Sequence, residues 1–152
     1  MSDVGAVHAH LEWLRSGDAS DPEHHYGLQM HIAEEWMRGT GLSGREICEV
    51  VAAWLAYGFA SGRLTFEFGD MIANDLNTFA QTDARTGQWF HTPFSWEVYL
   101  AFDAGEFSLT PGFDPVEGKT RPMINDIIQR AAALIEYPVA LAEPGATPQG
   151  SA

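Results

Sequence analysis

One predicted helix of this 152-residue chain carries histidines and carboxylates on a single face. At 100° per residue, His24, His31 and Glu35 fall within about 40° of one another. Histidine and carboxylate side chains are the usual ligands of zinc and iron. His24 and His31 lie about 10 Å apart along the helix axis, too far to bind one ion. Only His31 with Glu34 or Glu35 has a usable spacing, so the alternatives here are a divalent metal site and a solvated polar stripe.

Patterns typical of common enzymes are absent from the sequence. The order His-x-x-Glu reverses the Glu-x-x-His motif of di-iron bundles, and no His-Glu-x-x-His occurs. There is no Gly-x-Ser-x-Gly nucleophile motif and no glycine-rich phosphate loop of either common type. The only cysteine, Cys48, lies in an apolar segment, where a thiol is usually a small buried hydrophobe. The sequence therefore favours a protein that is not an enzyme.

A second polar group, Asp70, Asn74 and Asn77, lies on one side of another predicted helix, opposite its apolar residues. Two carboxylates could act as acid and base if a low-dielectric cleft separated their pKa values. The second carboxylate would have to come from another element, and Glu97 and Asp103 are the candidates. The alternative is a solvated helix face without chemistry.

Aromatic residues form a third group, in and beside a predicted loop at residues 82–92. Such residues either anchor a loop on the core or form a recognition surface. We expect an exposed member to be the leading interface candidate, because tryptophan and tyrosine dominate binding energy at hot spots. The members are Trp89, Phe90, His91, Phe94 and Trp96.

The predicted element that must position these groups is a helix at residues 43–62. Ser43 and Glu46 have the spacing of a capping box at its start. Beyond Glu49 the segment has almost no charged side chain to expose to water, so it is expected to be buried. Its apolar run, Val50 to Ala60, is far shorter than the roughly 20 residues needed to cross a bilayer. We expect Trp54 and Leu55 to lie in the middle of the domain.

Hydrophobic periodicity predicts a mostly α fold, a single compact domain of about six helices packed around the 43–62 helix. Alternating residues at 64–68 and 107–113 also suggest one short β pair. We expect the helical domain to cover residues 1–138 and a flexible tail to cover residues 139–152. The other predicted helices lie at 4–15, 21–38, 70–80, 93–104 and 121–137.

Charge limits the kinds of partner. With 21 acidic against 8 basic side chains, the chain carries a formal charge of −13. This charge is spread along the sequence and repels phosphate backbones and anionic membranes, so nucleic acid and membrane surfaces are disfavoured. A basic protein partner is favoured instead. Without a secretory signal at its start, the chain is expected in the cytoplasm.

These observations predict a small acidic interaction domain that neutralises or regulates a basic protein, and no cofactor is expected. In general character it is similar to bacterial toxin-neutralising immunity proteins, although no motif identifies one of their families. Protonation of six histidines would bring the charge to about −7 near pH 5, which should weaken binding. The alternative is a small helical metal-dependent enzyme or sensor that uses His31, Glu34 and Glu35. The predicted binding residues are Trp89, Phe90, His91, Asp70, Asn74 and Asn77.

Overall fold

The fold is taken from a computed structural model, which describes residues 4–17, 27–81 and 89–142. This part of the chain forms seven α-helices, one π-helix and one 3₁₀-helix, and it contains no strand. The mostly α prediction is confirmed. In chain order the elements are α1 (Gly5–Arg15), α2 (Met30–Thr40), α3 (Gly44–Ala60), α4 (Phe66–Ala80), α5 (Pro93–Asp103), the π-helix η2 (Val116–Thr120), α6 (Arg121–Gln129), α7 (Ala131–Leu134) and the 3₁₀-helix η3 (Pro138–Leu141).

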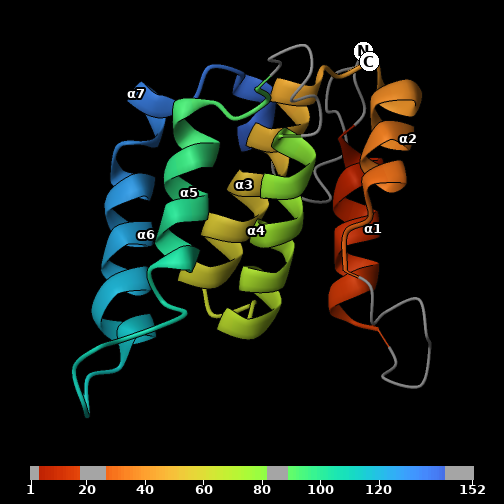
Figure 1. The fold of residues 1–152 in the computed structure, drawn as a ribbon. Helices are drawn as coiled ribbons and strands as arrows, with labels where there is room; N and C mark the ends of the chain where they lie inside the picture. Colours follow the sequence, from red (N-terminus) through yellow and green to blue (C-terminus); the bar gives the residue numbers. More distant parts are fainter. Residues whose placement is uncertain (1–3, 18–26, 82–88, 143–152) are drawn as a thin grey trace.

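Helix α3 is the centre of the domain, as its sequence predicts. Figure 1 shows it between α1 and α2 on one side and α5 and α6 on the other, and α4 and η3 also contact it. The predicted capping box is present, since Ser43 Oγ accepts from the amide of Glu46 and the Glu46 carboxylate accepts from the amide of Ser43. Only 3% of Trp54 is exposed, and Leu55 is fully buried. No helix of the described residues is long and apolar enough to cross a membrane.

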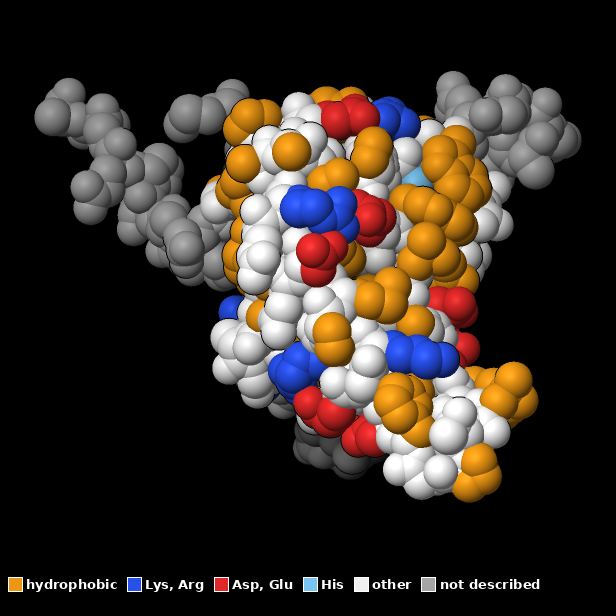
Figure 2. Space-filling view, turned by 90° about the vertical axis from the view of Figure 1, so that its left-hand side faces the viewer, with side chains coloured by type: hydrophobic (Ala, Val, Ile, Leu, Met, Phe, Trp, Pro, Cys, Tyr) orange, Lys and Arg blue, Asp and Glu red, His pale blue; other side chains and the backbone are white. Residues whose placement is uncertain are grey.

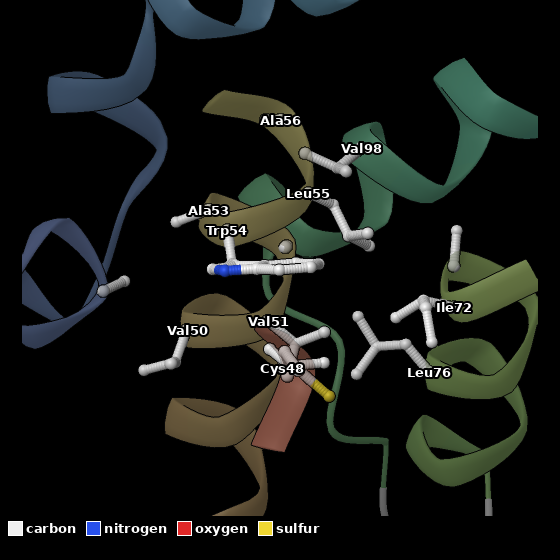
Figure 3. Packing of buried hydrophobic residues seen from close by; sticks show 14 of the residues in the cluster. Cys48, Val50, Val51, Ala53, Trp54, Leu55, Ala56, Ile72, Leu76 and Val98 are labelled. Atoms are coloured by element: carbon white, nitrogen blue, oxygen red, sulfur yellow. The ribbon is translucent and has the colours of Figure 1, made fainter. Parts of the chain in front are cut away.

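Side chains of α3 reach the core in several directions. Figure 3 shows Leu55 pointing toward Ile72 of α4, whereas Val50 and Ala53 point toward the C-terminal segment. All of these side chains are buried. A helix that meets neighbours around most of its circumference must be apolar around most of it, which accounts for the sequence of α3.

Glu49 is a charged side chain that α3 buries. The sequence suggests a charged side chain facing water, but Glu49 is completely buried. Its carboxylate accepts hydrogen bonds from the backbone amides of Glu136, at 3.0 and 3.1 Å, and of Tyr137, at 2.7 Å. Charge-assisted bonds to backbone amides compensate for the burial of a carboxylate. Glu49 thereby fixes the turn before η3.

The 3₁₀-helix η3 covers residues 138–141, so part of the segment expected to be a flexible tail has regular structure. The residues after 142 lie outside those described.

The suggested β pair at 64–68 and 107–113 is wrong. The Thr65 side chain accepts a hydrogen bond from the amide of Phe68, at 3.2 Å, so residues 66–68 form the first turn of α4. A helix cap thus overrides a five-residue alternation that is too short to decide between strand and helix. Phe107 and Leu109 alternate with polar residues in a loop, but both are exposed and pair with no strand among the described residues.

The second helix begins later than the sequence suggests. The expected start at residues 20–22 lies outside the described part of the chain, and α2 begins only at Met30. Gly27 has a left-handed φ of +61°, and a side chain there would collide with the Asp75 carboxylate. The same carboxylate accepts from the amide of Leu28, at 2.8 Å. This contact with α4 holds residues 27 and 28 in a non-helical conformation, which no local pattern could reveal.

Candidate functional site

The three predicted metal ligands lie on the outer surface of α2. His31, Glu34 and Glu35 are all exposed, and His24 lies outside the described residues. Among the described residues, no group of three or more histidine, cysteine, aspartate or glutamate side chains is arranged to hold a metal ion. The geometry in this part of the chain therefore gives the metal alternative no support beyond its sequence spacing.

The predicted polar group on α4 divides between two clusters. Asn74 donates one hydrogen bond to the carbonyl of Asp70, at 3.0 Å, and another to the Glu106 carboxylate, also at 3.0 Å. Asn77 lies one turn further along α4 and belongs to the aromatic cluster described below. The second carboxylate near Asp70 is therefore Glu106, which the sequence alone does not indicate.

Asp70 is a carboxylic acid whose pKa is strongly raised. Burial raises its pKa to about 7, and the negative charges of Glu106 and Asp103 act in the same direction. One oxygen of Asp70, Oδ1, is buried and has no hydrogen-bond partner among the described residues. Asp103 is thus near Asp70, as suggested, whereas Glu97 is bound to Arg130 instead. Such an acid can exchange a proton near neutral pH, but Asp70 lines neither the hollow beside Trp89 nor the larger cavity between α1 and α3.

His91 is the centre of the aromatic cluster. Its ring is buried, with 2% exposed, and its Nε2 lies 3.1 Å from Oδ1 of Asn77. On the other side, its Nδ1 lies 2.9 Å from the hydroxyl of Ser95. Burial lowers the pKa of His91 to about 4, so the ring is neutral at pH 7. His91 is therefore a buried support for its neighbours and carries no positive charge at that pH.

Three larger rings surround His91. The centroid of Trp89 lies 5.1 Å from that of His91, and Trp96 lies 5.4 Å from both rings. Tyr99, one turn beyond Trp96 on α5, lies 5.5 Å from it. Trp89 and Trp96 meet edge to face, an arrangement that aromatic quadrupoles favour. The result is a contiguous aromatic surface built on α5 and on the residues just before it.

The structure separates the predicted aromatic residues into anchors and surface residues. Phe94 is fully buried, and Phe90 packs against Phe79 at 5.4 Å between ring centroids. Trp89, in contrast, is 44% exposed and borders a shallow open hollow of about 310 Å³ that His91 and Trp96 also line. Phe90 and Phe94 therefore anchor this segment on the core, whereas Trp89 has the exposure that a recognition surface requires. Of the predicted loop, residues 82–88 lie outside the described part of the chain.

Arg45 at the start of α3 links the residues just before α5 to the rest of the bundle. Its Nη1 donates to the carbonyl of His91 at 3.0 Å, and its Nη2 forms two hydrogen bonds with the Glu136 carboxylate, at 3.0 and 2.9 Å. One guanidinium thus connects the residues before α5 with the turn before η3. Arg45 positions the aromatic surface without forming part of it.

Tyr99 connects the aromatic surface to the carboxylates. Burial and the negative charges of Asp103 and Glu106 raise the pKa of its hydroxyl, so both acids act on it electrostatically. Trp96, Tyr99 and Asp103 are spaced by three and four residues, so they lie on one side of α5. Figure 2 shows this side at the right, where a column of hydrophobic side chains has acidic side chains below it. We name this surface the aromatic-acidic face; its residues are Trp89, Trp96, Tyr99, Asp103 and Glu106, and the buried His91 supports them.

Nucleophilic chemistry at the single cysteine is disfavoured by its surroundings. Cys48 is fully buried in α3, and burial raises the pKa of its thiol, so the reactive thiolate is disfavoured. Comparison with known proteins does not change this picture: the chain matches no protein-family model, no curated protein and no solved structure.

Proposed function

We propose that this protein is an acidic interaction domain that binds a basic protein through its aromatic-acidic face. The observation that carries the proposal is the 44% exposure of Trp89 beside a hollow that His91 and Trp96 also line. A tryptophan held in place by ring contacts with His91 and Trp96 loses little conformational entropy on binding, which is a property of interface hot spots.

The chemistry of the face fits a cationic side chain. A lysine or arginine of the partner can lie over the Trp89 or Trp96 ring, since indole is the best cation-π acceptor among side chains. Asp103 and Glu106 lie at the other end of the face, where further basic residues of the partner can pair with them. The formal charge of −13 accelerates encounter with such a partner and disfavours nucleic acid.

We extend the proposal to a cytoplasmic protein that neutralises or regulates its basic partner, as immunity proteins do for toxins. Identification of the partner and of its compartment in the native host tests this extension.

The proposal is tested by affinity capture from the native host with two matched variants. Trp89→Ala removes the exposed ring of the face, and Trp13→Ala removes a ring of similar exposure, 40%, on α1. Wild type and Trp13→Ala should retain the same basic protein, whereas Trp89→Ala should bind it about 30-fold more weakly, as expected for a tryptophan hot spot. Equal retention by the Trp89→Ala variant would contradict the proposal.

A further inference from the structure

A cavity of about 410 Å³ lies where the second half of α3 meets α1 and η3. Its volume is within the range of about 300–1,000 Å³ that is typical of small-molecule sites. No residue of the aromatic-acidic face lines it. Its walls combine apolar surface with a few polar groups, contributed mainly by Trp54, Tyr57, Leu141, His8, Ser61 and Arg63.

Arg63 supplies a positive charge to this cavity. Its guanidinium carbon lies 5.1 Å from the ring centroid of Trp54, and within the described chain it forms no ion pair. A Cβ on Gly58 would lie only 3.0 Å from Nη2 of Arg63 and 2.7 Å from Leu64, so this glycine makes room for Arg63 against α3. Arg63 is exposed and its charge acts on Glu12, but no carboxylate of the described residues lies at ion-pair distance, so the guanidinium can pair with an anion supplied from outside.

His8 provides a second polar group. Only 6% of the residue is exposed, it lines the cavity, and its ring makes no hydrogen bond with the described residues. Burial and the nearby positive charge of Arg63 lower its pKa, so the ring is neutral at pH 7 and can donate one hydrogen bond. Neither ring nitrogen of His8 is among the buried polar atoms that lack a partner in the described residues, so the ring can reach a ligand in the cavity it lines.

We propose that this cavity binds a small organic carboxylate with an apolar body. The carboxylate would pair with the Arg63 guanidinium and accept from the His8 ring, while the apolar body would lie against Tyr57 and Leu141. Inorganic phosphate fits less well, because a single cation and a largely apolar wall leave most of its oxygens without donors. A cationic ligand would be repelled by Arg63.

The test uses benzoate and hexanoate as probes, with the neutral benzamide and hexanamide as matched controls. Binding to the full chain is followed by NMR through the Trp54 indole and His8 ring signals. Each carboxylate should bind about tenfold or more tightly than its amide, because a charge-assisted pair with arginine is lost in the amide. The proposal would be overturned if neither carboxylate shifted these signals at millimolar concentration. It would also be overturned if each amide bound as tightly as its acid.

Variants of Arg63 make the test specific. Arg63→Gln should weaken carboxylate binding about tenfold and remove the preference over the amide, and Arg63→Lys should retain part of it. Arg38→Gln on the exposed side of α2 is the matched control and should change nothing. Circular dichroism confirms that each variant is folded. Unchanged carboxylate affinity in Arg63→Gln would overturn the assignment to this cavity. The Trp89→Ala variant should bind the carboxylates normally. Carboxylate binding in the cavity and partner binding through the aromatic-acidic face are therefore tested independently.

Discussion

The Nε2 of His91 lies 3.1 Å from Oδ1 of Asn77, and this contact joins the residues before α5 to α4. An amide oxygen only accepts, so we infer that Nε2 carries the proton and that Nδ1 accepts from the Ser95 hydroxyl, 2.9 Å away. The surrounding hydrogen bonds thus select one neutral tautomer. A positive charge on this ring would lose its hydration on burial, which lowers the pKa of His91.

The first prediction concerns the pH dependence of stability through His91. Its pKa is about 4 when folded and about 6.5 when unfolded, so the unfolded chain binds a proton first as the pH falls. The neutral ring of His91 should make its full contribution to the free energy of unfolding above pH 6.5. This contribution should fall by about 2 kcal/mol as the pH approaches 4. Urea denaturation of wild type and His91→Gln at several pH values measures the difference, in which the other histidines cancel. A difference independent of pH would contradict the buried neutral ring.

The second prediction has the opposite sign and concerns Asp70. Its pKa is about 7 in the folded chain, against an ordinary value of 3.8 for an unfolded chain. Between these two pH values the folded state keeps a proton that the unfolded state has lost. Asp70 therefore destabilises the fold increasingly as the pH rises from 4 to 7. Asp70→Asn should raise the free energy of unfolding by on the order of 1 kcal/mol at pH 8, after allowance for solvent screening, and by nothing at pH 4.

The exposed Glu34→Gln is the control for loss of one negative charge in this acidic chain. If Glu34→Gln stabilised the protein as much as Asp70→Asn at pH 8, the effect would come from net charge and not from the surroundings of Asp70.

The third prediction concerns Arg45, which fastens the residues carrying Trp89. Arg45→Gln removes the hydrogen bond to the His91 carbonyl and the paired bonds to Glu136. We expect a loss of about 1–2 kcal/mol in the free energy of unfolding and broader NMR signals from the Trp89 indole. Arg15→Gln removes only an exposed pair with Glu12 within α1 and should cost less than about 0.5 kcal/mol. Equal losses in the two variants would argue against a positioning role for Arg45.

The fourth prediction concerns the dependence of partner binding on salt and pH. Affinity for a basic partner should fall as salt is added, because exposed charges are screened. Acidification to pH 5 should also weaken binding. The effect should be smaller than a change in net charge from −13 to about −7 would cause. Burial lowers the pKa of His8, His10 and His91, so these three rings gain fewer protons than free histidines would. Isothermal titration calorimetry with the captured partner measures both effects, and affinity independent of salt would argue against electrostatic recruitment.

The central helix was predictable because its sequence is sufficient to define it. Ser43 and Glu46 set its start, and apolar residues around nearly the whole circumference demand burial. The start of α2 was not predictable, because the contact of Asp75 with Leu28 comes from a residue 47 positions away. The buried Glu49 was missed for the same reason, since its partners are the amides of residues 136 and 137.

The site was partly predictable. Residue types identified Trp89, His91 and Asn77, but only the packing shows that Trp89 is exposed while Phe94 is buried. A loop has no periodicity from which to infer the orientation of a side chain. Tyr99 could have been found from its spacing of three residues from Trp96 on one helix. Glu106 could not, because it follows α5 in a turn whose path depends on tertiary contacts.

The most direct measurement of the central claim is oxidative footprinting of the protein with and without its captured partner, read by mass spectrometry at individual tryptophans. Binding through the aromatic-acidic face should protect Trp89 and Trp96 and leave Trp13, which has similar exposure to Trp89, oxidised at its free rate. Protection of Trp13 with Trp89 still fully reactive would contradict the account.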